Sequence, residues 1–327
     1  MKILVTGSAG HLGEALMRSL AGGPHEVVGA DIKPSAHTHH VGSIADRAFV
    51  AGCLRGIDAV LHTGTLHKPH VATHSRQAFV DTNIGGTLNL LEEAVSQGAR
   101  AFVFTSTTST FGDALTPPPG APAAWITEDV VPVPKNIYGV TKVAAEDLCQ
   151  LFWRLHRLPT VVLRTSRFFP EIDDEPALRG AYVDANIKVN ELLHRRVDVQ
   201  DVVDAHRLAI ERAPSIGHGR YIISATAPFE RDEAAQLRDG LAGIVRRRVP
   251  AFEAEYARRG WRLFPGLDRV YVNQKARREL GWSPRHDFGA AIERLSAGDD
   301  YHSPLAQAIG SKGYHARIFE NGPYPVA

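Results

Sequence analysis

A short apolar run followed at once by a glycine-rich turn opens the chain. Residues 3–5 (ILV) are apolar and rich in β-branched side chains, and glycine then recurs at every third position as Gly7, Gly10 and Gly13. Residues 14–20 continue with the spacing of a helix. Strand, glycine-rich turn and helix in this order are the context that a dinucleotide-binding motif requires.

Each glycine of this turn has a distinct expected role. Gly7 allows a tight turn out of the strand, Gly10 lets the backbone approach a pyrophosphate, and Gly13 lets the helix pack on the sheet. The pyrophosphate is expected at the helix N-terminus, where free N–H groups favour an anion. The predicted cofactor-binding residues of the turn are Gly7, Ala9, Gly10, His11, Leu12 and Gly13.

An acidic residue completes the dinucleotide signature. Residues 25–31 (HEVVGAD) are typical of a second strand, and the strand ends on Asp31, eighteen residues after Gly13. A carboxylate at this point hydrogen-bonds the adenosine ribose hydroxyls and repels a 2′-phosphate. The sequence therefore predicts NAD as the cofactor, and the nearby Lys33 leaves NADP open as the less favoured alternative.

Composition limits the classes of partner. The chain has 327 residues, enough for about two domains, and its formal net charge of +1 gives no reason to expect nucleic-acid or membrane binding. Two cysteines, Cys53 and Cys149, have no metal or redox spacing and suggest a reducing compartment. The histidines at 37–40 fit a solvated loop, so no metal site is predicted. Because the first strand begins at the N-terminus, we expect a cytoplasmic protein without a signal peptide.

Strands and helices alternate along the first half of the chain, which predicts an α/β fold with a Rossmann-type doubly wound parallel sheet. We expect an NAD-binding domain over residues 1–168 and a smaller, interleaved substrate lobe over most of 169–327, with sheet elements returning at about 197–225. The expected strands are 59–62, 100–106, 159–164 and 220–224; the expected helices are 81–95, 136–157, 230–248 and 275–282.

The strongest catalytic signal is the pair Tyr138 and Lys142 at the start of the long helix. Residues four apart share one helix face, so the phenol and the ammonium group should lie side by side. The cation is expected to lower the pKa of Tyr138 towards the working pH of a general base. A strand that ends in the hydroxyl-rich run 105–110 (TSTTST) precedes this helix and can supply a hydroxyl opposite the tyrosine.

At this point the chain resembles the extended short-chain dehydrogenase/reductases, in particular their epimerase/dehydratase branch. The resemblance covers residues 1–170 well and rests on several motifs besides the glycine turn and Asp31. These are Asp58, the NxxGT motif at 83–87, the Ser/Thr run before Phe111-Gly112, the PxxxYxxxK motif at 134–142, and Leu163-Arg164.

The resemblance implies roles for single residues. Thr107 would be the catalytic hydroxyl, with Ser106 as the substitute if the loop is shifted by one residue. Tyr138 would be the acid/base, and Lys142 would hold the nicotinamide ribose. Asn83 would anchor a loop near the nicotinamide, although it could equally cap its helix. Ser43 and Ile44 stand at the adenine position, where the family often has Asp-Ile after a glycine.

The stretch after residue 164 departs from the epimerases of nucleotide sugars. Arg167 stands where those enzymes commonly have asparagine, and the RxSxxFPE stretch at 164–171 instead resembles uronate dehydrogenases of the same superfamily. Arg167 and Arg179 could each bind a carboxylate or phosphate, or form ordinary ion pairs. His67 lies in a loop that overhangs the substrate in this fold. The expected substrate-binding residues are Ser106, Thr107, His67, Arg167 and Arg179.

These observations favour an NAD-dependent sugar or nucleotide-sugar epimerase/dehydratase. A dehydrogenase of a free sugar or uronate is the close alternative. A non-catalytic dinucleotide-binding regulator is less favoured, because Tyr138 and Lys142 are both present. By resemblance we also expect a homodimer through helices near 81–97 and 138–156.

Overall fold

The computed structural model describes residues 1–315, 319–320 and 322–325. In this part of the chain seven parallel strands form one sheet, in the order β3-β2-β1-β4-β5-β7-β8. The chain runs outward from β1 in both directions, so the switch point of the topology lies between β1 and β4. The strands are β1 (Lys2–Thr6), β2 (Glu26–Asp31), β3 (His40–Val41), β4 (Ala59–His62), β5 (Ala101–Thr107), β7 (Thr160–Thr165) and β8 (His218–Ile223).

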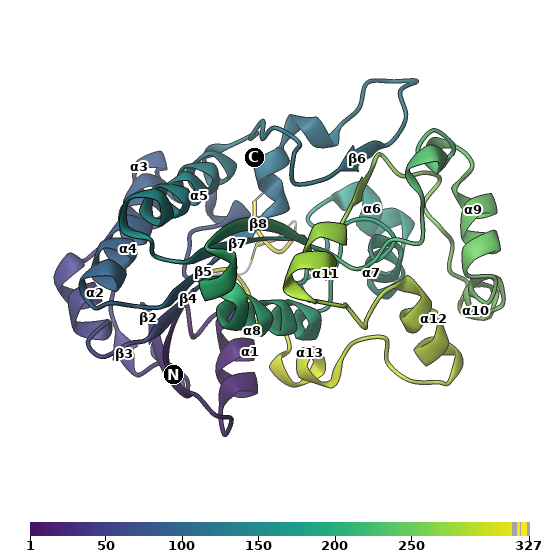
Figure 1. Ribbon diagram of the computed structural model, residues 1–327. Coiled ribbons are helices and arrows are strands. Elements are labelled where there is room, and N and C mark those ends of the chain that lie inside the picture. The colour runs from purple at the N-terminus through teal and green to yellow at the C-terminus, as the bar shows by residue number, and fades with distance from the viewer. Residues whose placement is uncertain (316–318, 321, 326–327) are drawn as a thin grey trace.

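Helices cover both faces of this sheet (Figure 1), which confirms the predicted doubly wound fold class. One face is covered by α1 (His11–Leu20), α8 (Val199–Ile216), α11 (Gln274–Leu280) and α13 (Pro304–Ile309). The other is covered by α2 (Arg47–Cys53), α4 (Gly86–Ser96) and α5 (Ile137–His156). The helix predicted at 81–95 is present, but it begins earlier and is not uniform. Helix α3 (Arg76–Phe79) leads into a π-helical segment, Val80–Gly85, which is followed by α4.

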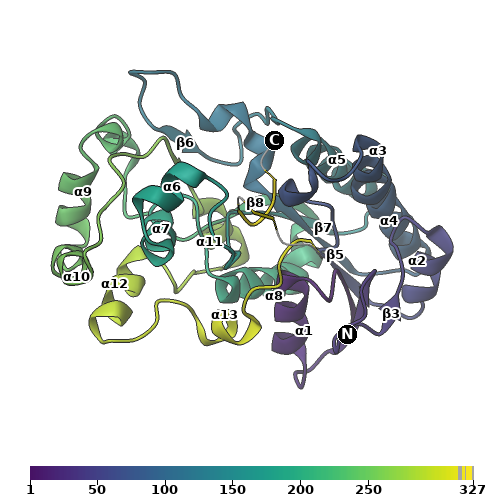
Figure 2. The same cartoon turned by 180° about the vertical axis from the view of Figure 1, so that it is seen from behind.

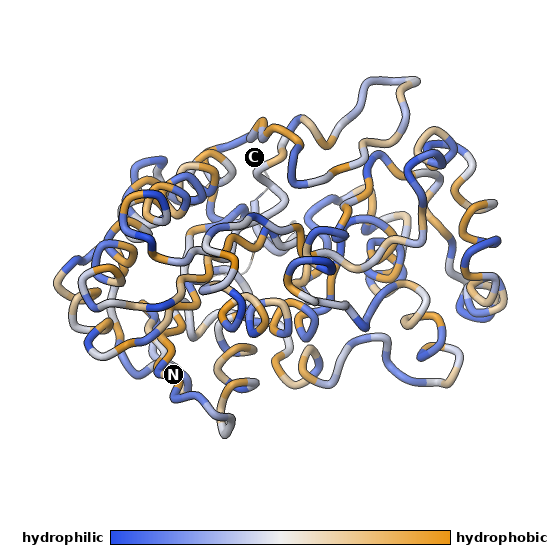
Figure 3. Tube along the Cα trace, viewed as in Figure 1, coloured by the Kyte–Doolittle hydropathy of each residue, from blue (hydrophilic) through white to orange (hydrophobic). Residues whose placement is uncertain are grey.

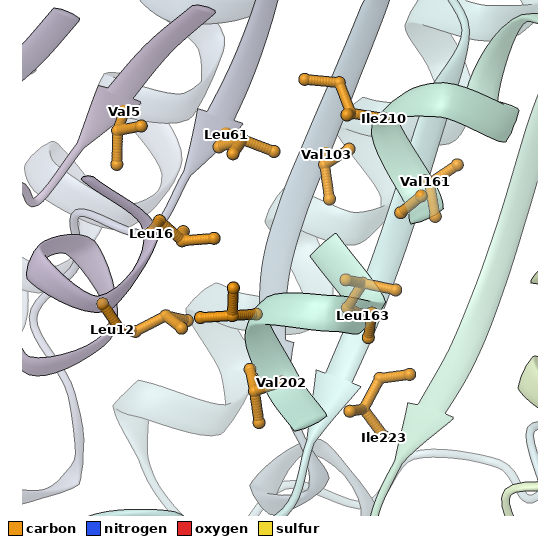
Figure 4. Close-up of a cluster of buried hydrophobic side chains, with 14 of the residues drawn as sticks. Val5, Leu12, Leu16, Leu61, Val103, Val161, Leu163, Val202, Ile210 and Ile223 are labelled. Carbon is orange, nitrogen blue, oxygen red and sulfur yellow. The ribbon is translucent and has the colours of Figure 1, made fainter. Parts of the chain in front are cut away.

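Alternate residues of the central strands point into two hydrophobic cores, one on each face of the sheet. Val5 and Leu61 join Leu16 of α1 in one core, while Leu4 and Val60 lie in the other. Figure 4 shows the first core, with side chains from the sheet meeting those of α1 and α8. Burial on both faces explains why the strand sequences are continuously apolar, and the hydropathy colouring in Figure 3 shows the same central strands as hydrophobic.

A second lobe has its own core. It contains α6 (Pro176–Ala181), α7 (Asp184–Glu191), α9 (Leu241–Arg248), α10 (Phe252–Arg259) and α12 (Phe288–Ser296). A two-stranded parallel sheet, β6 (Ala124–Ile126) with β9 (Arg269–Tyr271), accompanies these helices. Figures 1 and 2 show the lobe gathered at one side of the large sheet, whereas the intervening α8 and β8 return to that sheet.

The helix predicted at 230–248 is wrong in its first half. The chain there forms two 3₁₀ turns, Arg231–Glu233 and Gln236–Arg238, and α9 begins only at Leu241. The backbone carbonyls of Ala234 and Leu237 accept hydrogen bonds from Ala123 and Leu267, respectively. Tertiary backbone pairing thus replaces the helical hydrogen bonds that the local pattern favoured.

Candidate active site

The glycine-rich turn has the geometry of an anion-binding loop. Gly7 adopts φ +74°, and a Cβ atom on Gly13 would lie 1.9 Å from the Gly7 carbonyl oxygen, so the helix passes directly against the turn. α1 begins at His11, and no side chain caps its first N–H groups. Those N–H groups are therefore available to a phosphate, as the backbone of a dinucleotide site requires.

The end of β2 lies beside this turn. Asp31 accepts a hydrogen bond from the Ala9 N–H at 3.0 Å and another from the Lys33 N–H at 2.8 Å. The Ser43 hydroxyl accepts from the Ala45 N–H at 3.2 Å, and Ile44 packs against Gly86 of α4. The turn and the Asp31 carboxylate thus adjoin each other, and their donor and acceptor chemistry fits an NAD molecule laid across the ends of β1 and β2.

Asn83 holds a loop rather than capping its helix. Its side-chain oxygen accepts from the Leu66 N–H at 2.9 Å, and its amide donates to the Leu66 carbonyl at 2.8 Å. The same amide donates to the hydroxyl of Thr141 on α5 at 3.0 Å. Asn83 therefore joins the loop after β4 to the helix that carries Tyr138.

Thr107 and Tyr138 are brought together. Thr107 is the last residue of β5, and Tyr138 lies in the first turn of α5, whose N-cap Asn136 accepts from the Gly139 N–H at 3.2 Å. The Thr107 side chain lies beside the phenol of Tyr138, a residue that is only 8% exposed. Burial raises the pKa of Tyr138 to about 12, and the neighbouring Thr107 hydroxyl opposes the shift.

Lys142 shares the helix face of Tyr138, as expected, but it is engaged elsewhere. Its ammonium group donates to the Thr105 carbonyl at 2.6 Å and lies 3.9 Å from the centre of the Phe104 ring. Burial lowers the pKa of Lys142 to about 7. The expected lowering of the Tyr138 pKa is wrong: burial of the phenol raises it, and the Lys142 ammonium group is engaged by the Thr105 carbonyl.

The Ser106 hydroxyl is engaged by Glu146 of α5. It donates to this carboxylate at 2.5 Å, and Arg164 also binds Glu146 at 2.7 Å. Thr107, the last residue of β5, is therefore the hydroxyl that lies next to Tyr138. Glu146 was not among the predicted site residues, although it follows Lys142 by one helical turn.

His67 lies close to Tyr138. The centres of the His67 and Tyr138 rings are 6.5 Å apart, and the His67 ring stacks on Phe169 at 5.6 Å. Burial lowers the pKa of His67 to about 3, so the ring is neutral at physiological pH. A third ring, that of Tyr314 near the C-terminus, lies 5.2 Å from His67. No feature of the local sequence around Tyr314 signals this position.

The two predicted arginines are already engaged with acidic or carbonyl oxygens. Arg167 contacts the carboxylates of Asp173, Asp174 and Glu191, and its side chain is 27% exposed. Arg179 donates to the Asp173 carbonyl at 2.6 Å. A substrate anion would have to compete with these groups for either guanidinium.

One cavity adjoins the site, but neither Thr107 nor Tyr138 lines it. Its volume is 30 Å³ and its walls include His11, Phe168 and Tyr301. Such a volume holds about two water molecules. Among the residues that the structure describes, no group of three or more His, Cys, Asp or Glu side chains could hold a metal ion. Over the same residues, no helix is long and apolar enough to cross a membrane.

A doubly wound parallel sheet, a glycine-rich turn at β1 and a Thr–Tyr–Lys arrangement at β5 and α5 define a nucleotide-dependent oxidoreductase of the short-chain type. A sequence model of the NAD dependent epimerase/dehydratase family matches residues 3–224. The chain belongs to this family, and the predicted family, enzyme class and cofactor, NAD, are confirmed.

Similar proteins differ in reaction. The UDP-glucose 4-epimerase of Rhizobium meliloti is 27% identical over 89% of this chain and 94% of its own length. The uronate dehydrogenase of Pseudomonas putida is 27% identical over 52% of this chain and 62% of its own length. A solved short-chain dehydrogenase/reductase superfamily protein from Agrobacterium tumefaciens, with bound NAD, has a TM-score of 0.66 at 24% identity and covers 91% of this chain and 96% of its own. The last comparison supports the fold.

Proposed function

We propose that this enzyme transfers a hydride between NAD and a carbinol carbon of a sugar, with Tyr138 as the acid/base. The observation that carries the proposal is the position of the buried Tyr138 beside Thr107, at the carboxyl end of β5. Two hydroxyls that converge on one point can hold a substrate oxygen and move its proton. The family includes enzymes that act on sugars, as the relatives' names state.

The positions of the glycine-rich turn, Asp31 and the end of β5 indicate which residues would hold NAD. The turn from Gly7 to Gly13 would hold the pyrophosphate, Asp31 the adenosine ribose, and Ser43 with Ile44 the adenine. Asn83 and Lys142 would lie at the nicotinamide half, because both are fixed beside α5 and β5. NAD supplies the hydride acceptor when bound. A carboxylate at Asp31 disfavours the 2′-phosphate of NADP.

Tyr138 and Thr107 have different roles at the substrate oxygen. Thr107 orients the oxygen, and Tyr138 removes its proton during oxidation or returns a proton during reduction. With its pKa raised to about 12, the phenol is protonated at neutral pH and is ready to donate. Lys142, fixed by the Thr105 carbonyl, would hold the ribose hydroxyls.

The fate of the hydride separates two candidate reactions. Epimerisation or dehydration returns the hydride to the substrate, and the long match to a UDP-glucose 4-epimerase favours that reaction. Net oxidation of a free sugar or uronate releases NADH, and the Phe168-Phe169-Pro170 stretch beside Arg167, together with the shorter match to a uronate dehydrogenase, favours it.

Reduced-nicotinamide absorbance tests the proposal on a panel of free sugars, uronates and nucleotide sugars, with product analysis for each. Hydride transfer that Tyr138→Phe abolishes supports the proposal. Turnover unaffected by Tyr138→Phe and by Thr107→Ala would contradict it. In parallel, calorimetric titration with NAD and NADP should show NAD preferred, and Asp31→Ala should weaken that preference.

We further propose a homodimer through residues 81–97 and 138–156, in a reducing, cytoplasmic environment. Val140, Leu151 and Leu155 on α5 are exposed apolar side chains at 49%, 38% and 65%. Cys53 and Cys149 are both free and buried. Light scattering should give twice the monomer mass, and a monomer mass would rule the dimer out under those conditions.

A further inference from the structure

The segment after α13 crosses the site. We call it the C-terminal strap and define it as residues 310–315, 319–320 and 322–325. Figures 1 and 2 show this last stretch of the chain running from α13 between the two lobes, past the ends of the central strands. Its position far along the chain from β1, β4 and β7 means that only the tertiary structure brings it there.

The C-terminal strap is bound to three separate parts of the carboxyl edge. Lys312 forms an ion pair with Glu14 of α1 at 2.5 Å. The His315 ring donates to the Pro69 carbonyl at 2.9 Å, in the loop after β4. Glu171, in the loop after β7, accepts from the N–H groups of residues 312 and 313 at 3.2 and 3.1 Å. The strap thus ties together loops that flank the proposed hydride-transfer site.

Tyr314 is the residue of the strap that reaches deepest. Its ring centre lies 5.2 Å from that of His67 and 5.7 Å from that of Phe169, and its hydroxyl donates to Glu171 at 3.2 Å. His67 in turn contacts the Tyr138 ring. Only one ring therefore separates Tyr314 from the catalytic phenol, and Tyr314 contacts both the β4 loop and the β7 loop.

A second tyrosine of the C-terminal strap, Tyr324, packs against Tyr314. The ring of Tyr324 lies 5.4 Å from that of Tyr314, and Tyr324 is only 7% exposed. A sugar held at Tyr138 would lie beside His67, whose ring contacts both Phe169 and Tyr314. Tyr314 and Tyr324 therefore extend this cluster of rings outward from Tyr138.

The charges around the strap disfavour a diphosphate. Glu171, Asp173 and Asp174 line the β7 loop, and the neighbouring cations already have carboxylate partners. Lys68 pairs with Asp174, and Arg167 contacts three carboxylates. Recognition of a phosphate needs an arginine, a lysine or a set of free N–H groups directed at it. Lys68 and Arg167 would each have to release a carboxylate partner before they could bind a phosphate.

We propose that Tyr314 and the C-terminal strap limit the substrate to a single free sugar and exclude nucleotide-linked sugars. The inference rests on the proposed hydride transfer at a sugar carbinol. Tyr314 is then a specificity-determining residue: its ring forms the outer wall of a site one sugar deep, against which the apolar C–H face of the sugar packs.

The test compares substrate classes in the full-length enzyme with NAD. A free sugar or uronate should give hydride transfer, and UDP-sugars should give none. UDP alone should show no heat of binding in calorimetry. Tyr314→Ala should raise the KM for the free sugar by up to about tenfold with little change in kcat, the range expected for loss of one aromatic contact. The same variant should acquire measurable binding of UDP.

Two further variants keep the test decisive. Gln307→Ala alters an exposed residue of α13 just before the strap and should match the wild type in every assay. Glu171→Ala removes the acceptor that holds residues 311–314 without removing the Tyr314 ring, and it should also admit UDP. It replaces Tyr314→Ala if that variant does not unfold cooperatively.

The outcomes separate this inference from the proposed function. Wild-type turnover of a UDP-sugar with a kcat/KM equal to or above that of any free sugar would overturn the inference and leave hydride transfer at Tyr138 intact. UDP binding unchanged in both variants would also overturn it. If no sugar of either class is oxidised, reduced or epimerised, the proposed function falls and the inference falls with it.

Discussion

The ammonium group of Lys142 donates to the backbone carbonyl of Thr105, 2.6 Å away, in the strand next to the helix that carries it. This bond fixes the Lys142 side chain between β5 and α5, four residues along the helix from Tyr138, the proposed acid/base. Tyr138 lies beside Thr107, two residues further along β5. One strand end therefore contacts both Tyr138 and Lys142.

The first prediction concerns the pH dependence of sugar oxidation. The pKa of Tyr138 is raised to about 12 by burial, so the fraction of phenolate increases as pH rises towards that value. The oxidation rate should therefore increase with pH, approaching tenfold per unit well below the pKa. Steady-state kinetics on wild type and Tyr138→Phe measure this. We expect the variant to lose about a hundredfold or more in kcat and to lose the pH dependence.

The second prediction concerns the glycine turn. A Cβ atom on Gly13 would clash with the backbone of Gly7, whereas one on Gly52 of α2 would meet nothing within 4 Å. Gly13→Ala should abolish NAD binding in calorimetry or prevent folding. Gly52→Ala should bind NAD normally and gain up to about 1 kcal/mol in the free energy of unfolding, because alanine favours a helix. Equal NAD affinity in the two variants would contradict the assignment.

The third prediction concerns the buried ion pair of Glu146 and Arg164, whose side chains are 1% and 3% exposed. Glu146→Gln leaves the arginine buried without its charge partner and should lower the free energy of unfolding by about 3–5 kcal/mol. The exposed pair Arg246 and Glu253 is the matched control, since Glu253→Gln should cost less than about 1 kcal/mol. Denaturant titration measures both, and similar losses would show that burial is not the cause.

The fourth prediction concerns acid stability. Burial lowers the pKa of His206 to about 4, so the folded chain binds fewer protons than the unfolded chain between about pH 4 and 6.5. The stabilising effect of keeping this ring neutral is full above about pH 6.5 and is lost as pH falls through that window. His206→Gln should reduce the slope of unfolding free energy against pH there by up to about one proton. An unchanged slope would show that His206 does not titrate on unfolding.

Much of this site could be predicted from local pattern. Gly7, Gly13 and Asp31 act through backbone geometry and strand ends, which short-range sequence encodes, and the alternation of strands and helices determined the parallel sheet. Tyr138 and Lys142 share a helix face because of helical periodicity alone. Thr107 was favoured over Ser106 by the resemblance alone, and only the structure shows that Ser106 is bound to Glu146.

The sequence by itself determined the fold class, the family and the positions of the proposed catalytic residues Thr107, Tyr138 and Lys142, because these depend on spacing within a few residues. Only the tertiary structure decided that Arg167 is held by three carboxylates, that Lys142 is engaged by Thr105, and that Tyr314 lies beside His67. Those contacts join residues that are distant in the chain or placed by loops without a period. Their formation depends on how the lobes and the C-terminal strap pack, which local sequence does not specify.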